Sequence, residues 1–221
     1  MDPAPSGAHA RLLPLRLRSP GSFAAALLVL LAALSGPLES AAEASLAAHM
    51  VQHMLLIGVA APLLALAHPS PRLAGWPVAA RRAVATAVRA LQPIGRPRAA
   101  FALHAAAIWL AHAPRVVDWA AAYPWVHVLE HVVLIGTALA FWWALLRAHA
   151  ARSAVAPLLA LGTLVHTGLL GALLALAPHA LYPGYGLEDQ QLAGLIMWVP
   201  GGLCYLAAGL AIATAWVPRA G

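Results

Sequence analysis

The fold of this chain is decided by one stretch, Leu46-Ala-Ala-His49-Met-Val-Gln-His53-Met-Leu-Leu-Ile-Gly-Val-Ala-Ala-Pro62-Leu-Leu-Ala-Leu66, which is uncharged apart from its histidines. A helix that spans a membrane needs about 20 mostly apolar residues, so this stretch predicts one. Five further stretches have the same character, at about 21–38, 99–113, 124–146, 154–177 and 190–216. The sequence therefore predicts an all-α, polytopic bundle of about six transmembrane helices.

The composition of the 221-residue chain also excludes an ordinary soluble protein. Hydrophobic residues make up 62% and charged residues 9%, against roughly 45–50% and 25% in soluble domains, and the mean hydropathy is +0.80. The single cysteine, Cys204, rules out an intramolecular disulfide and a cysteine-only zinc site. Eleven histidines outnumber the seven carboxylates, and this surplus is the unusual feature of the composition.

The arginines predict the orientation of the bundle. If the N-terminus is cytoplasmic, 12 of the 13 arginines lie inside and only Arg115 lies outside. The outer side then holds most of the carboxylates, namely Glu39, Glu43, Asp118, Glu188 and Asp189. This asymmetry follows the positive-inside rule. We therefore interpret the pI of about 10.7 as an orientation signal and an attraction to the anionic lipid bilayer, and we expect no nucleic-acid partner.

The chain reads as one domain. We predict a cytoplasmic N-terminal segment at 1–20 and a single transmembrane helical domain at 21–221, with a cytoplasmic loop at about 67–98. Within this loop Val84, Val88 and Leu91 share one helical face, which predicts a helix lying on the membrane interface. Trp142 and Trp143 are expected near the inner interface. The first apolar segment is also typical of a secretory signal peptide, whose cleavage would leave five spans in the same orientation.

The histidines lie mainly toward the outer side, where eight of the eleven fall. Two pairs spaced i, i+4, His49/His53 and His127/His131, lie about 5 and 10 Å below the outer ends of their helices at 1.5 Å per residue. Residues four apart share a helical face, so neighbouring helices could bring four imidazoles together. A separation of the His53 and His131 side chains below about 6 Å supports one shared metal site, and one beyond about 12 Å excludes it.

The residue types around these pairs indicate a metal. Glu130 lies in the same arc as His127 and His131, and an intramembrane glutamate is costly unless it is paired. It could bind the metal, orient an imidazole or relay protons. Imidazole with thioether suits copper, and imidazole with carboxylate also suits zinc or iron. We predict as metal ligands His49, His53, His127 and His131, with copper preferred over zinc or haem.

Other polar side chains are assigned to the surroundings of the site or to its access route: Glu130, His112, Asp118, His104, His166, Met50, Met54, Met197 and Asp189. Simpler interpretations stay open for several of them. His104 and His166 are equally typical of hydrogen bonds between helices, the methionines of packing, and Asp189 of an ordinary N-cap. In the last helix, Pro200-Gly201-Gly202 predicts a kink that frees backbone carbonyls.

Three blocks of the sequence resemble the CtaG-like family of cytochrome c oxidase assembly proteins, of the caa3-oxidase type. The first block is His49-Met-Val-Gln-His53-Met-Leu-Leu, running into Ala-Pro62-Leu-Leu. The second includes Trp109-Leu-Ala-His112, Asp118, and His127-Val-Leu-Glu-His131 followed by Phe141-Trp-Trp. The third runs from Leu181-Tyr-Pro-Gly-Tyr185 through Asp189-Gln-Gln-Leu-Ala-Gly-Leu-Ile-Met-Trp198-Val-Pro-Gly. The resemblance covers about 46–205. Longer relatives often have seven spans, whereas six are predicted for this chain.

The resemblance implies a multi-pass assembly factor of the bacterial inner membrane, without enzymatic activity. It matches the four paired histidines to those of the family, and His112, Asp118 and Asp189 to its other polar positions. Copper would be held near the outer face and passed to cytochrome c oxidase subunit I, with other copper chaperones as further partners. Because neutral imidazole binds the metal, affinity should fall as the pH drops through about 6.5.

Two other functions remain open from the residues themselves. The first is a haem-binding membrane cytochrome, although i, i+4 pairs lie on one face and would not hold a haem from both sides. The second is a transporter for metal or protons along Glu130, His166 and Pro200, although the inner halves of the helices are almost purely apolar.

Overall fold

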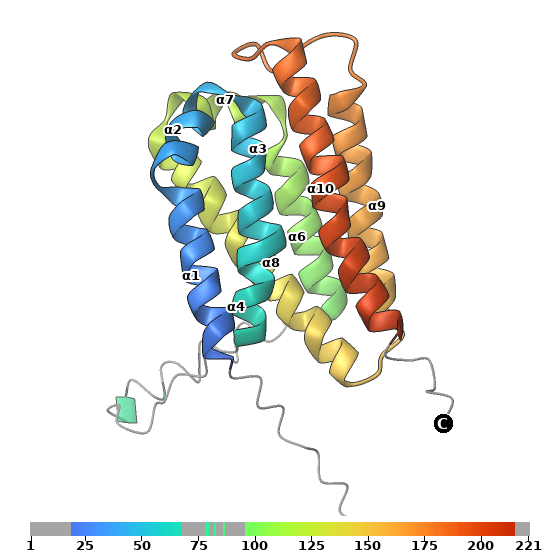
Figure 1. Cartoon of the computed structure of the whole chain (residues 1–221). Coiled ribbons are helices and arrows are strands. Elements are labelled where there is room, and N and C mark those ends of the chain that lie inside the picture. Colours follow the sequence, from blue (N-terminus) through green and yellow to red (C-terminus); the bar gives the residue numbers. More distant parts are fainter. Residues whose placement is uncertain (1–18, 68–77, 80–81, 83–85, 87–95, 215–221) are drawn as a thin grey trace, which may run out of the picture.

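The computed structural model describes residues 19–67, 78–79, 82, 86 and 96–214 (Figure 1). The predicted N-terminal cytoplasmic segment and the predicted interfacial helix around Val84, Val88 and Leu91 lie outside these residues, apart from isolated positions. The described part is helical and contains no strand, so the all-α prediction is confirmed.

Half of the described helices begin where the sequence places proline. Five of them have proline in the first turn, where its fixed φ suits the helix and its missing N–H costs nothing. In chain order the helices are α1 Pro20–Leu34, α2 Pro37–Ala44, α3 Leu46–Met54, the π-helical η1 Leu55–Ala60, α4 Ala61–Ala67, α6 Pro97–Ala111, α7 Pro114–Ala122, α8 Pro124–Ala150, α9 Val155–Ala175 and α10 Leu187–Thr214.

The number of membrane spans agrees with the prediction. Four helical stretches of the described chain are long and apolar enough to cross a membrane: Leu46–Ala67, Pro124–Ala150, Val155–Ala175 and Leu187–Thr214. Two bent pairs, α1 with α2 at 45° and α6 with α7 at 69°, raise the number to as many as six. Because of these bends, α2 and α7 lie across one end of the bundle, beside the α9–α10 loop (Figure 1). We call this end the capped end.

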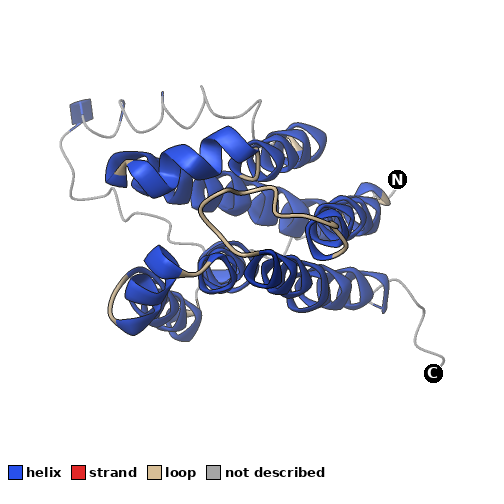
Figure 2. Cartoon of the chain, turned by 90° about the horizontal axis from the view of Figure 1, so that it is seen from above, coloured by secondary structure: helices blue, strands red, loops and turns tan. Residues whose placement is uncertain are grey.

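The long helices pack side by side in a bundle (Figure 2). Helix α10 packs along α9 and α3, α8 contacts α4 and α6, and α1 lies against η1 and α4. The main core includes Leu56, Ile108 and Phe141, which are almost fully buried. Leucines such as Leu158 and Leu203 point outward and are exposed, as expected for side chains that face lipid. The span formed by α3, η1 and α4 therefore lies between α1, α8 and α10.

A helical irregularity occurs in η1. The ring of Pro62 cannot fit the carbonyl of residue 58 in a regular α-helix, and the preceding turn is π-helical, with the Ala61 N–H donating to the Leu56 carbonyl. Trp142 of α8 donates its indole N–H to the Ile57 carbonyl of this turn at 2.8 Å. Helix α10 stays helical through Pro200, so the helix is not interrupted there, and the kink expected at this position stays a prediction. The Trp142 side chain is 5% exposed and packs inside the bundle, and its expected depth near the inner interface stays a prediction.

The charges of the described chain separate between the two ends, except for Arg115, which lies on α7 at the capped end. Arg98, Arg147 and Arg152 lie at the start of α6 and the end of α8, away from the capped end. All the carboxylates that the structure describes lie in α2, in α7, or in the first two turns of α8 and α10, namely Glu39, Glu43, Asp118, Glu130, Glu188 and Asp189. The capped end is therefore the acidic end of the bundle.

Asp189 is not the N-cap of its own helix. It lies in the first turn of α10, and its carboxylate accepts hydrogen bonds from the hydroxyl of Ser45 at 2.8 Å and from the N–H groups of Leu46 at 2.6 Å and Ala47 at 3.1 Å. These N–H groups belong to the first turn of α3, which has no partners for them within the helix. Asp189 therefore joins α10 to the N-terminus of α3, the helix that carries His49 and His53.

We expect Asp189→Ala to lower the free energy of unfolding by about 1–2 kcal/mol, because the variant removes charge-assisted bonds to a helix N-terminus. Thermal unfolding in detergent measures this change. Glu188→Ala is the matched control, because Glu188 directly precedes Asp189 and is exposed. This variant should change the free energy of unfolding by less than about 0.5 kcal/mol. Equal effects of the two variants would show that the contact with α3 contributes nothing.

Candidate metal centre

The two histidine pairs occupy equivalent positions on two helices that both start at the capped end. His49 and His53 are the fourth and eighth residues of α3, and His127 and His131 are the fourth and eighth residues of α8. The side chain of the N-cap Ser45 accepts a hydrogen bond from the Ala48 N–H. This cap fixes the residue at which α3 begins. Each pair therefore presents two imidazoles on one helical face at the same depth in the bundle.

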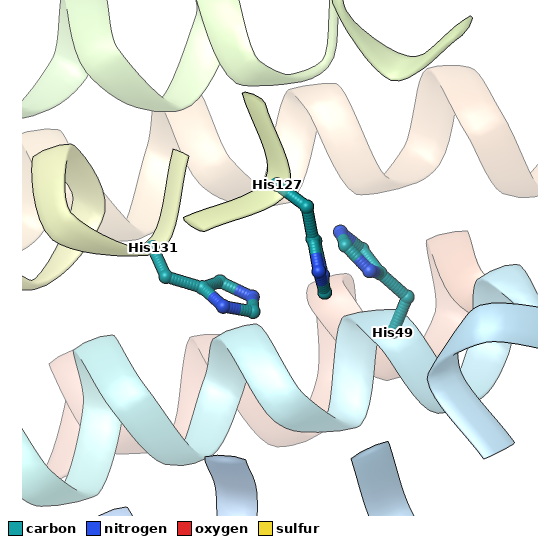
Figure 3. A group of neighbouring side chains, drawn as sticks. All are labelled: His49, His127 and His131. Atoms are coloured by element: carbon teal, nitrogen blue, oxygen red, sulfur yellow. The ribbon is translucent and has the colours of Figure 1, made fainter. Parts of the chain in front are cut away.

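The four rings converge between α3 and α8. Figure 3 shows His49 of α3 facing His127 of α8, with His131 beside them. Across the two helices the ring centroids are 5.1 Å apart for His49 and His127 and 5.3 Å apart for His53 and His131. Within each helix the rings are 4.2 and 4.3 Å apart. The His53 and His131 rings are thus closer than the separation of about 6 Å below which the sequence analysis expects one shared metal site.

Glu130 brings a carboxylate to the same place. Its Oε2 lies 3.5 Å from Nε2 of His49 and 3.9 Å from Nε2 of His53. Two groups of potential ligand atoms result, each with its atoms within 4.8 Å of one another: His49, His127 and His131, and His49, His53 and Glu130. His49 is common to both groups. Both sets are of the size and chemistry that imidazole-binding transition metals require.

Several of the potential ligand atoms are buried without hydrogen-bond partners in the described part of the chain. These atoms are both ring nitrogens of His53, Nε2 of His127, Nε2 of His131 and Oε2 of Glu130. Buried polar atoms of proteins are almost always hydrogen-bonded, and an orphaned one costs about 1–3 kcal/mol. A cluster of such atoms facing one another is what a metal ion would satisfy, so the residues present fit a metal.

Two of the surrounding residues predicted from the sequence join this cluster. His112, at the end of α6, has its ring centroid 6.2 Å from that of His53. Its Nε2 lies 3.2 Å from the sulfur of Met50, which is on the same face of α3 as His53. The structure therefore brings six of the predicted side chains besides Glu130 together from α3, α6 and α8.

Other predicted residues lie apart from the cluster. His104 contacts the hydroxyls of Thr137 and Tyr205 at 3.2 and 3.3 Å, which is the simpler role that the sequence left open. His166 packs on Phe101, with no hydrogen bond to its ring within the described residues. The remaining positions are elsewhere: Asp118 is exposed on α7, Met54 packs on Gly201, Met197 is in the core, and Asp189 binds α3.

A cavity of about 290 Å³ leads to the cluster at the capped end. His49, His127 and Glu130 line it together with Glu43 of α2 and Tyr185 of the α9–α10 loop. Of the residues predicted for the access route, neither Asp118 nor Asp189 lines it. Besides Glu130, the carboxylate that lines it is Glu43, which the sequence analysis treated only as an outer-side charge.

Two functional neighbours were missed from the sequence. Gln52 is fully buried, and its amide donates to the Ala33 carbonyl at 2.7 Å and to the Glu39 carboxylate. Glu39 in turn lies 4.0 Å from Nδ1 of His127. The one available signal was an amide side chain next to His53 within an apolar helix. This network ties the bent α1–α2 segment to both histidine pairs.

The α9–α10 loop closes over the end of α6. Tyr182 donates its hydroxyl hydrogen to the His112 carbonyl at 2.9 Å. Burial, with the nearby Glu130 charge, raises the pKa of Tyr182 to about 12, so this tyrosine remains a hydrogen-bond donor at physiological pH. Gln190 holds the loop by accepting from the Leu181 N–H at 2.6 Å. The α9–α10 loop, itself held by Gln190, therefore binds the backbone that carries His112.

The sequence was compared with known proteins and protein families. The sequence model of one family, described as cytochrome c oxidase caa3 assembly factor (Caa3_CtaG), matches residues 10–219. No curated protein matches the chain, and no solved structure matches it.

Proposed function

Because the chain belongs to the cytochrome c oxidase caa3 assembly factor family, we propose that it binds a copper ion between α3 and α8 and delivers it to the oxidase during assembly. Membership in the family implies a non-catalytic role, in which copper is the cargo. The observation that carries the proposal is the convergence of His49, His53, His127, His131 and Glu130 as buried or half-buried, mutually facing donors.

The donor set favours copper over other metals. Several imidazoles with a thioether close by suit copper, whereas a structural zinc site normally has cysteine thiolates or a closed tetrahedron of ligands. Met50 supplies the thioether beside His112, and the chain's one cysteine, Cys204, lies on α10 beside Gly58 of η1. Copper is therefore the ion we assign, with zinc as the competitor to be measured.

The charge distribution supports an orientation for this function. Arginines at the end of the bundle away from α2 and α7 agree with a cytoplasmic position for that end. The capped end then faces the outer side of the bacterial inner membrane, where carboxylates such as Glu39 and Glu43 raise the local concentration of cations. Copper would enter through the cavity beside Glu43 and His127. Other copper chaperones would supply it there.

The receiving partner we assign is cytochrome c oxidase subunit I. The family is defined by assembly of this oxidase, and a site about two helical turns below the capped end is reached most directly from a neighbour in the same bilayer. Several side chains of α8 next to the cluster, including Val128, Leu129 and Val132, are exposed on the surface of the bundle. Lateral contact through α8 would bring subunit I within a short distance of His127 and His131.

The proposal is tested by the copper content of the oxidase in cells that carry variants of this chain. With Glu130→Gln the copper-to-haem ratio of the purified oxidase should fall well below that with the wild type. The amide keeps the shape of the carboxylate but removes the charge beside His49 and His53, which should weaken metal binding about 10–100-fold. Glu188→Gln, at an exposed carboxylate of the same end, should leave the ratio unchanged. A normal ratio with Glu130→Gln and in cells lacking the chain would contradict the proposal.

A further inference from the structure

His112 lies against two hydrogen-bond acceptors. Its Nδ1 is 2.7 Å from the carbonyl oxygen of Ile108, and its Nε2 is 3.2 Å from the sulfur of Met50. A carbonyl oxygen and a thioether sulfur accept hydrogen bonds and have no hydrogen to donate, whereas a neutral imidazole carries a single N–H. One of the two contacts of the neutral ring must therefore bring two lone pairs face to face.

The distances decide which contact has the hydrogen. The carbonyl of Ile108 is the stronger acceptor and the closer one, so Nδ1 carries the hydrogen and donates it there. This is the usual way in which a backbone carbonyl selects the tautomer of a metal-binding histidine. A doubly protonated ring would satisfy both acceptors, but it would bury a positive charge beside the other imidazoles. The lone pair of Nε2 then points at the Met50 sulfur.

A third donor stands next to this pair. His53 is three residues after Met50 on α3 and therefore on the same helical face, and its ring centroid is 6.2 Å from that of His112. Both nitrogens of His53 are buried and have no hydrogen-bond partner in the described chain. Met50, which is almost fully buried, also lines the cavity that contains His49 and Glu130. The three donors are thus within reach of an ion that enters by the same route.

We propose that Met50, His53 and His112 form a second metal position, specific for a soft monovalent cation, Cu(I), next to the position formed with Glu130. A cation between Nε2 of His112 and the Met50 sulfur converts two opposed lone pairs into two metal bonds. Thioether ligands select Cu(I), whereas carboxylate suits harder ions. His53 contributes to both positions, so an ion can pass between them by exchanging Glu130 for Met50 and His112. The inference rests on the proposed function and adds the oxidation state of the cargo.

The test is metal binding by the purified full-length protein without oxygen. Cu(I) affinity is measured by competition with a coloured Cu(I) chelator, and Zn(II) affinity by competition with a zinc indicator. Met50→Leu removes the sulfur at nearly constant volume, and it should weaken Cu(I) binding about tenfold or more while Zn(II) binding stays within about twofold. Glu130→Gln should weaken Zn(II) binding more than Cu(I) binding. Met54→Leu, one turn further on α3, is the matched control and should bind both ions as the wild type does.

A spectroscopic measurement on the wild type tests the sulfur ligand directly, even if a variant fails to fold. X-ray absorption of the Cu(I)-loaded wild type should show a sulfur atom bound to copper, which Met50→Leu loses and Met54→Leu retains. Copper bound by nitrogen and oxygen alone, or unchanged Cu(I) affinity in Met50→Leu, would overturn the second position while leaving the proposed function intact. Failure of the wild type to bind copper in either oxidation state would instead contradict the proposed function itself.

Discussion

The His53→Ala/His131→Ala double variant is expected to lose high-affinity copper binding. His53 belongs to one of the two ligand groups and His131 to the other, so the double variant leaves neither group with three donors. Loss of a group that only orients a ligand already costs about 10–100-fold in affinity, and we expect at least a hundredfold loss here. Either single variant should lose less, because the other group remains complete.

Copper stoichiometry and affinity of the purified protein measure this effect. The matched control is His149→Ala/His179→Ala, which removes two histidines outside both groups. His149 lies on the same helix as His131 but 18 residues further on, which is about 27 Å at 1.5 Å per residue. Visible spectra of both proteins test the haem alternative, since a haem-binding cytochrome has an intense Soret band. Equal copper binding by the double variant and the wild type would remove the assignment of these ligands.

The second large effect is expected from Gly194→Ala, which should destabilise the bundle by about 3 kcal/mol or more. Helices α9 and α10 approach so closely at Gly171 and Gly194 that a Cβ atom on Gly194 would lie 2.4 Å from the backbone nitrogen of Ala175 and 2.6 Å from the Gly171 carbonyl oxygen. Both are backbone atoms, which cannot move aside as a flexible side chain can. Small residues at such crossings are the means by which membrane helices pack closely.

Thermal unfolding in detergent, followed by circular dichroism, measures the loss. Gly136→Ala is the matched control, because a Cβ atom on Gly136 of α8 would meet nothing within 4 Å. Alanine should be neutral there or stabilise the helix by up to about 1 kcal/mol. If Gly194→Ala unfolds at the same temperature as Gly136→Ala, the close approach of α9 and α10 does not contribute to stability.

The effect of Gly194 should also reach the metal site. Asp189 is five residues earlier on α10, and it binds the first turn of α3. A displacement of α10 from α9 would therefore disturb the helix that carries His49 and His53. Loss of copper affinity in Gly194→Ala, with all the ligands still present, would be the sign of this connection.

Much of the architecture followed from local patterns. The spans were predictable because about 20 apolar residues are a property of one continuous segment, and the family resemblance, which the family match confirms, is also carried by continuous blocks. The equal depth of the histidine pairs followed from the constant helical rise. Helix α10 continues through Pro200 because proline in a packed membrane helix can be accommodated without interrupting it, whereas the turn before Pro62 became π-helical.

The sequence by itself determined the helices, the positions of His49, His53, His127 and His131 along them, and the separation of arginines from carboxylates. Only the tertiary structure decided that α3 lies beside α8, that Glu130 faces His49, and that His112 meets Met50 from a third helix. The physical reason is that periodicity specifies which face of a helix is polar but not which helix it meets. That choice depends on close contacts between residues far apart in the chain, such as Gly171 with Gly194 and Asp189 with Leu46.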